Sequence, residues 1–212
     1  MQDGGKRMRI AAGAIAVTGA LALATQPFVG YEMLPILTGE QPSWGRVLWL
    51  MTGFFTILTH LVCVWVMTGM ARGRREADGT ALGALTLALL VVMIVYHALL
   101  ARLWQPWGYG QVADIFLHSL LPIAVFGFWL VWAPKRAYTP RTLLQWLIWP
   151  AAYAAYALAR GLAFGDYPYP VLDIGTLGPG AVARNILAIS LLFVGLACLL
   201  YGLSRLLPER WR

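Results

Sequence analysis

The sequence predicts an all-α membrane protein, and three observations lead to that prediction. The chain of 212 residues is 60% hydrophobic and only 12% charged, whereas soluble domains carry about 25% charged residues. Its apolar residues fall in six runs, which approach or exceed the roughly 20 residues that a helix needs to cross a bilayer core. Its lysines and arginines gather in short clusters between those runs. We therefore expect a single domain, one bundle of six transmembrane helices.

The six expected spans cover residues 10–29, 47–70, 81–104, 111–133, 142–163 and 181–205. The segments between them are too short for a soluble domain. The first run follows basic residues and ends near Ala-Leu-Ala-Thr-Gln, as a cleavable signal peptide would. A retained helix is favoured because the run is almost long enough to span, and because the basic chain ends indicate a common side for both termini.

The charges predict the orientation of the bundle. The N-terminus, the 71–80 loop, the 134–141 loop and the C-terminus each carry three Lys or Arg residues. The other three loops are poor in Lys and Arg, and two of them hold acidic residues instead: Glu32, Glu40, Asp166 and Asp173. This alternation follows the positive-inside rule, so both termini are expected in the cytoplasm. The net charge of +7 therefore reflects membrane topology, and nucleic acid is not an expected partner.

Cysteines and loops add two further expectations. Cys63 and Cys198 lie inside apolar runs without metal-ligand spacing, so we expect packing residues and no metal or cofactor. The outer segments 103–110 and 165–176 combine proline with tryptophan and tyrosine. Their aromatic residues suit the membrane interface, and a lid over a cavity that opens outward is the alternative interpretation.

Polar residues of five spans fall at one depth, in the outer half of the expected bundle. They are Thr56, His60, Tyr96, His97, Arg102, Asp114, His118, Tyr153, Tyr156, Arg160, Arg184 and Asn185. Each has an ordinary explanation, because a membrane threonine usually bonds to its own helix, a histidine can bridge helices, and an arginine can reach the headgroups or pair with Asp114. Together they indicate a polar pocket that faces the outer leaflet.

Asp114 and His118 lie four residues apart, on one face of a helix. An aspartate in this position orients an imidazole and stabilises its charged form, as a general base requires. The hydroxyl at a similar depth is that of Thr56, the expected nucleophile. Thr59 points to another face, and His60 is a rival base. A nearby Arg, Tyr or Asn would stabilise the oxyanion.

Three motifs carry a family resemblance: Phe-Phe-Thr56-Ile-Leu, Ala-Asp114-x-x-x-His118-x-x-x-Pro122, and Tyr-Pro-Tyr-Pro-Val-Leu-Asp173. The chain resembles the bacterial six-pass membrane relatives of the androgen-induced and androgen-dependent TFPI-regulating protein family. That resemblance implies an intramembrane hydrolase of fatty acid esters of hydroxy fatty acids. It gives Thr56 the nucleophile's role and His118 the base's role. It also implies a bacterial cytoplasmic membrane and a lipid ester substrate.

Other classes of function remain open from the sequence. A haem or quinone redox protein would use His97 and His118, which lie at matching depths, as axial ligands. A lipid or small-molecule carrier or transporter is a second alternative, although the chain has no internal repeat. A non-catalytic scaffold would tolerate loss of Thr56 and His118 with little effect beyond stability.

Overall fold

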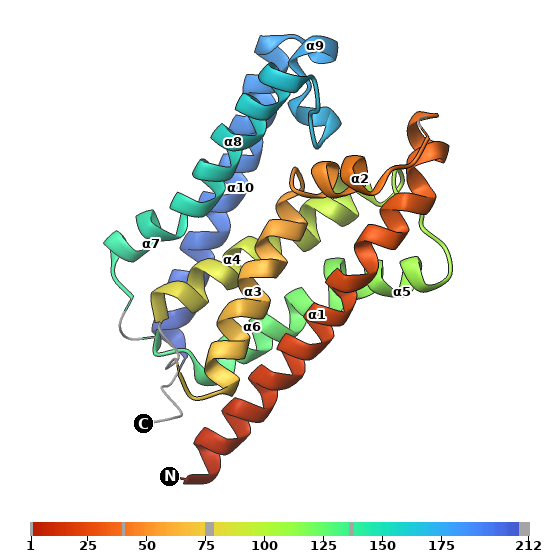
Figure 1. Ribbon diagram of the computed structural model, residues 1–212. Helices are drawn as coiled ribbons and strands as arrows, with labels where there is room; N and C mark the ends of the chain where they lie inside the picture. Colours follow the sequence, from red (N-terminus) through yellow and green to blue (C-terminus); the bar gives the residue numbers. More distant parts are fainter. Residues whose placement is uncertain (1, 40, 75–78, 136–137, 208–212) are drawn as a thin grey trace.

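The computed structural model describes residues 2–39, 41–74, 79–135 and 138–207, and the regular elements in those ranges are helical (Figure 1). The longer helices are α1 (Gln2–Thr38), α3 (Phe55–Ala71), α4 (Gly79–Val95), α6 (Leu121–Trp132), α8 (Ile148–Phe164) and α10 (Pro179–Leu206). The shorter helices are α2 (Trp44–Met51), α5 (Tyr109–Ile115), α7 (Pro140–Trp146), α9 (Ile174–Leu177) and the 3₁₀ turn η4 (Pro170–Leu172). Two π-helical segments, η1 (Tyr96–Leu100) and η2 (Phe116–Leu120), extend α4 and join α5 to α6.

Among the described residues, four stretches are long and apolar enough to cross a membrane, which marks the chain as an integral membrane protein. They are Gly4–Thr38, Gly79–Leu100, Tyr109–Trp132 and Pro179–Leu206. A fifth crossing results if α2 and α3, which meet at 79°, count as one bent span. The all-helical class is confirmed, whereas the expectation of six regular spans is not.

Two expected spans are broken, one at a proline and the other at a bend that side chains of another helix stabilise. The run 142–163 is divided into α7 and α8, because Pro150 has no N–H to continue the helical bonding from the preceding turn. The 17 residues of α8 extend only about 25 Å, less than the roughly 30 Å of a bilayer core. The run 47–70 bends between Met51 and Phe55. Hydropathy measures composition and does not register where a helix ends and restarts.

Side chains of α8 stabilise the bend between α2 and α3. They donate to carbonyl oxygens left free at the end of α2: Arg160 to Trp49 (2.8 Å), Tyr156 to Thr52 (3.1 Å) and Tyr153 to Gly53 (2.8 Å). Lipid offers no donors for such carbonyls, so the helix can end here only if other side chains bond to them. A Cβ on Gly53 would lie 2.6 Å from the Arg160 guanidinium, so a side chain here would displace that guanidinium from its position.

The main core lies where α1 packs along α3 and where α4 packs on α6. At one end of this core, the buried Trp129 indole donates to the Tyr138 hydroxyl over 2.7 Å. Trp146 of α7 packs so closely on α4 that a Cβ on Gly83 would lie 2.3 Å from its ring. The start of α1 and the end of α10 lie at the same end of the bundle (Figure 1). Their exposure to the cytoplasm stays a prediction.

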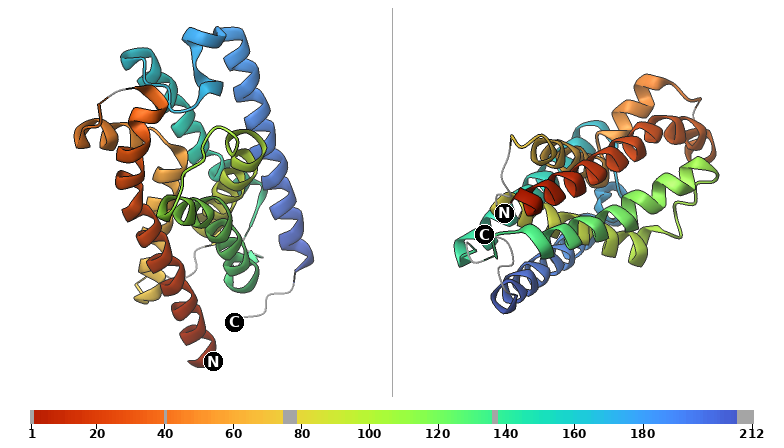
Figure 2. Two further views of the ribbon diagram at one scale, coloured as in Figure 1. Left: turned by 90° about the vertical axis from the view of Figure 1, so that its right-hand side faces the viewer. Right: turned by 90° about the horizontal axis from the view of Figure 1, so that it is seen from below.

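Helices α8 and α10 stand to one side of this core (Figure 1). The segment containing η4 and α9 joins them at the end opposite the chain termini (Figure 1 and Figure 2). Asn185 of α10 donates to the Val171 carbonyl over 2.9 Å and so fixes this segment above the space between the helices. Residues of α3, α4, α8 and α10 line one cavity below this segment.

Candidate functional site

A cavity of about 330 Å³ occupies that space. Residues of α3, of α4 with η1, of α8 and of α10 form its walls, and Tyr169, Val171 and Leu172 line it from the segment that joins α8 to α10. Its lining is largely Val, Leu, Ile, Ala and Phe. Five lining residues carry a hydroxyl group: Thr56, Tyr96, Tyr153, Tyr169 and Ser190. A space of this composition suits an apolar chain with a small polar group.

Thr56 lies at the polar end of the cavity, and the bend before α3 determines how its hydroxyl can bond. Other threonines in these helices donate back to the carbonyl four residues earlier, as Thr86 does to Leu82 over 2.8 Å. The corresponding residue for Thr56 is Thr52, which lies beyond the bend, and the described hydrogen bonds include no such back-bond. The Thr56 side chain instead interacts with Tyr169. Its hydroxyl is therefore available at a cavity wall.

Asp114 brings His118 and Tyr96 together. One carboxylate oxygen lies 2.9 Å from His118 Nδ1, and the other accepts a 2.6 Å bond from the Tyr96 hydroxyl. Because a carboxylate only accepts, Nδ1 carries the proton and Nε2 is the basic nitrogen of the neutral ring. The Tyr96 and His118 rings stack with centroids 3.7 Å apart and planes 8° from parallel. Asp114 thus pairs with a histidine and a tyrosine, and its described contacts include no arginine.

These residues lie on the two π-helical segments. Tyr96 and His97 begin η1, while His118 and Ser119 lie within η2. The segments contact each other directly, because His97 Nε2 lies 2.9 Å from the Ser119 hydroxyl. A π-helical turn offsets side chains from their regular α-helical positions and is frequent at functional sites. The sequence offered no signal for these turns.

Of the two expected catalytic residues, Thr56 is in contact with the cavity and His118 is not. Thr56 lines it, whereas His118 stacks against Tyr96, which does. Among the described contacts, none joins the threonine hydroxyl directly to the imidazole. Tyr96 is the residue that connects the cavity to the Asp114–His118 pair. The two expected catalytic residues thus lie near Tyr96, which lines the same cavity as Thr56 and stacks on His118.

His60, the rival base, is fully buried. Its Nδ1 donates to the Thr56 carbonyl over 2.8 Å, so Nε2 is an acceptor, and it has no hydrogen-bond partner among the described groups. His60 does not line the cavity. This bond lies within α3, one turn from Thr56, and the other described interactions of His60 are with Leu117 and His118 of η2.

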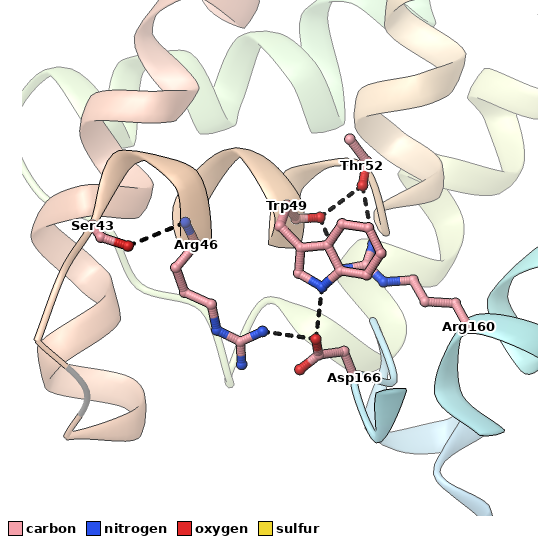
Figure 3. Close-up of polar contacts among 6 residues, drawn as sticks. All are labelled: Ser43, Arg46, Trp49, Thr52, Arg160 and Asp166. Atoms are coloured by element: carbon pink, nitrogen blue, oxygen red, sulfur yellow. Dashed lines mark hydrogen bonds and ion pairs between the residues drawn. The ribbon is translucent and has the colours of Figure 1, made fainter. Parts of the chain in front are cut away.

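The other expected polar residues lie in three different surroundings. Arg102 and Arg184 are exposed, as headgroup-facing arginines would be. Asn185 bonds to the segment over the cavity. Arg160 is 4% exposed and lies outside the cavity lining, in a network that the sequence did not predict (Figure 3). Its guanidinium lies over the Trp49 ring at 4.3 Å.

That network closes the outer end of α8 against α2. Asp166 accepts 2.7 Å bonds from both Arg46 and the Trp49 indole (Figure 3). These bonds, above all the one from Arg46, hold the pKa of the Asp166 carboxyl below its usual range. The sequence indicated Asp166 only as an outer-loop acid, because its partner is 120 residues away.

Tyr169 is the principal site residue that the sequence reasoning did not name. It lies in the Tyr-Pro-Tyr-Pro motif, reaches down from the outer segment and packs its ring on Phe54 at 5.7 Å. Its hydroxyl interacts with Thr56 and with Tyr153. Burial raises the pKa of the Tyr169 phenol, so this hydroxyl is a neutral donor. The unusual motif was the available signal, and it was interpreted as a lid or an interface segment.

The site shows no arrangement for a metal ion. Within the described residues, no cluster of three His, Cys, Asp or Glu side chains has the arrangement of a metal site.

The chain was compared with known proteins in three ways. No family model, no curated protein and no solved structure matches it. The family resemblance of the three motifs therefore stays a prediction.

Proposed function

We propose that this protein hydrolyses a lipid ester within the membrane, with Thr56 as nucleophile and His118 as general base. The observation that carries the proposal is the position of Thr56, where the bend frees its hydroxyl from back-bonding at the wall of an apolar cavity. The substrate class is a fatty acid ester, of the hydroxy fatty acid type that the family resemblance implies. One acyl chain fits the cavity, because about 330 Å³ equals roughly eleven water-sized volumes, and a methylene group is of similar size.

In the proposed reaction, the Thr56 oxygen attacks the ester carbonyl carbon while His118 Nε2 takes the hydroxyl proton. The tetrahedral intermediate collapses, and the imidazolium returns the proton to the departing alcohol. Water then hydrolyses the acyl-threonine by the same steps in reverse and releases a fatty acid. Asp114 holds the imidazole in the required tautomer. His118 approaches Thr56 when a substrate displaces the Tyr96 ring that covers it.

We further propose a bacterial cytoplasmic membrane as the location, with both termini in the cytoplasm and the cavity in the outer-leaflet half. The clusters of Lys and Arg support this orientation. The residues that close the cavity belong to the acidic outer loop 165–176. Lipid would then reach the site from the surrounding leaflet.

A non-catalytic lipid carrier is the second candidate, and one observation favours it. The described hydrogen bonds leave Thr56 and His118 unconnected, as a binding cavity without chemistry would. A carrier would bind fatty acids or their esters and release them unchanged.

Turnover of p-nitrophenyl decanoate by the purified protein in nanodiscs separates the two candidates. The hydrolase proposal expects activity in the wild type, loss in Thr56→Ala and His118→Ala, and partial recovery in Thr56→Ser. Thr59→Ala is the matched control, because Thr59 is buried on the same helix, accepts from Trp149 and lies outside the cavity lining. Equal activity in wild type and Thr56→Ala, or no turnover by a folded wild type that binds decanoate, would favour the carrier.

A further inference from the structure

Two tyrosines converge on the Thr56 end of the cavity from different elements. Tyr153 comes from α8 and donates to the Gly53 carbonyl over 2.8 Å, with its ring 4.9 Å from Phe55. Tyr169 comes from the segment over the cavity and interacts with the Thr56 hydroxyl. Both rings line the cavity, and the two hydroxyls interact with each other. The hydroxyl groups are therefore concentrated at the one point where an ester carbonyl would meet Thr56.

The bonding of these hydroxyls determines where the Tyr169 proton can go. The Tyr153 proton is used by the Gly53 carbonyl. Tyr153 can therefore only accept from Tyr169, whereas the Thr56 hydroxyl and the N–H groups of Phe55 and Thr56 can donate to the Tyr169 oxygen. The Tyr169 proton can go to the Tyr153 oxygen, and an acceptor in the cavity competes with that oxygen for it. An ester carbonyl is such an acceptor.

The position next to Thr56 is the one that stabilises a tetrahedral intermediate. When the threonine oxygen bonds to the carbonyl carbon, negative charge develops on the carbonyl oxygen, which is attached to the same carbon. That oxygen is then within reach of a donor that already contacts the nucleophile. Hydrolases also use the backbone N–H of the nucleophile for this purpose. The N–H of Thr56 lies in the first turn of α3, where a helix supplies no carbonyl partner.

We propose that the Tyr169 hydroxyl donates to the substrate's carbonyl oxygen and stabilises the oxyanion that forms when Thr56 attacks, with Tyr153 as the residue that positions it. This inference rests on the proposed hydrolase function and adds a catalytic residue to it. As the carbonyl π pair moves to oxygen, the Tyr169 hydrogen bond becomes charge-assisted and strengthens. No proton is transferred from Tyr169, so Thr56 and His118 keep their roles. The outer segment is thereby part of the active site, and its ordering controls the chemistry.

Phenylalanine variants test this assignment, because each removes one hydroxyl and keeps the ring. In Tyr169→Phe, kcat for p-nitrophenyl decanoate should fall about 100- to 1,000-fold, the usual loss for one oxyanion donor, while KM changes little. Tyr153→Phe should lower kcat by a smaller factor. Tyr156→Phe is the matched control, since its hydroxyl also bonds a carbonyl of the α2–α3 bend but lies outside the cavity lining. Thermal melting of the three variants shows whether they fold alike.

A trifluoromethyl ketone with a decyl chain supplies the second readout, because the hemiketal that it forms with Thr56 carries the oxyanion. Its affinity should fall in Tyr169→Phe by the same factor as kcat/KM, whereas decanol binding should not change. An active wild type with an equally active Tyr169→Phe overturns this inference and leaves the hydrolase intact. A folded wild type with no turnover overturns the proposed function and the inference with it.

Discussion

Replacing Arg160 with methionine tests the role of α8 in holding the α2–α3 bend. Arg160 is 4% exposed, donates to the Trp49 carbonyl and the Thr52 hydroxyl, and lies over the Trp49 ring (Figure 3). Methionine keeps much of the length of the side chain but none of these interactions. The carbonyl oxygen of Trp49 would then keep only the bond from the Thr52 hydroxyl (2.7 Å) among its described donors.

The expected loss follows from the types of contact. A hydrogen bond from a charged donor contributes about 1.5–3 kcal/mol, and a cation–π contact adds about 1 kcal/mol. Removal of a buried charge recovers part of its desolvation cost. We therefore expect Arg160→Met to lower the free energy of unfolding by about 3 kcal/mol. Arg46→Met is the comparison, because Arg46 is 30% exposed in its ion pair with Asp166 and such pairs contribute about 0–1 kcal/mol.

Reversible unfolding in mixed detergent micelles, with rising SDS, measures both variants against the wild type. Arg160→Met should unfold at a clearly lower SDS fraction than Arg46→Met. If the two variants differ by less than about 1 kcal/mol, the buried guanidinium does not hold the bend, and the explanation for the position of Thr56 fails with it.

Three other predictions use contacts elsewhere in the structure. Asp114→Asn should slow ester turnover about 100- to 10,000-fold with unchanged melting, because the amide no longer fixes the tautomer of the His118 imidazole. Steady-state kinetics measures this loss, and turnover near the wild-type rate would contradict the assigned tautomer. Gly83→Ala should destabilise by about 1–3 kcal/mol because its Cβ would overlap the Trp146 ring, whereas Gly127→Ala on α6, with open space around it, should be neutral or stabilising in the same unfolding assay; equal effects would refute the close packing. Asp166 has a lowered pKa in the folded protein, so its ion pair stabilises above the unfolded-state pKa of about 3.9 and loses this effect as pH falls through the lower folded pKa. Melting of the wild type relative to Asp166→Asn should show that loss, and a constant difference across acidic pH would contradict it.

The sequence predicted the helical membrane class because length and apolar composition suffice for it. It did not predict the break at Gly53, since the bend depends on donors from α8 that are about 100 residues away. The break within 142–163 is different, because Pro150 is a local signal that the expectation of one helix did not use. Local hydropathy contains no information about which distant side chain replaces a lost backbone bond.

The candidate site was predictable where partners are close in sequence. The contact between Asp114 and His118 follows from a four-residue spacing, and the structure contains it. Tyr169 could not be assigned in the same way, because its neighbours Thr56 and Tyr153 come from two other elements. Arg102 and Arg184 shared the expected depth but are exposed, since depth along a helix does not determine which face a residue occupies.

Localisation of a covalent adduct tests the central claim most directly. The purified protein would be treated with an alkyl fluorophosphonate, digested and analysed by peptide mass spectrometry, with Thr56→Ala and Thr59→Ala alongside. The account predicts a phosphonyl adduct on Thr56 in the wild type and in Thr59→Ala, and none in Thr56→Ala. An adduct on another residue, or a folded wild type that forms none, would contradict Thr56 as the nucleophile.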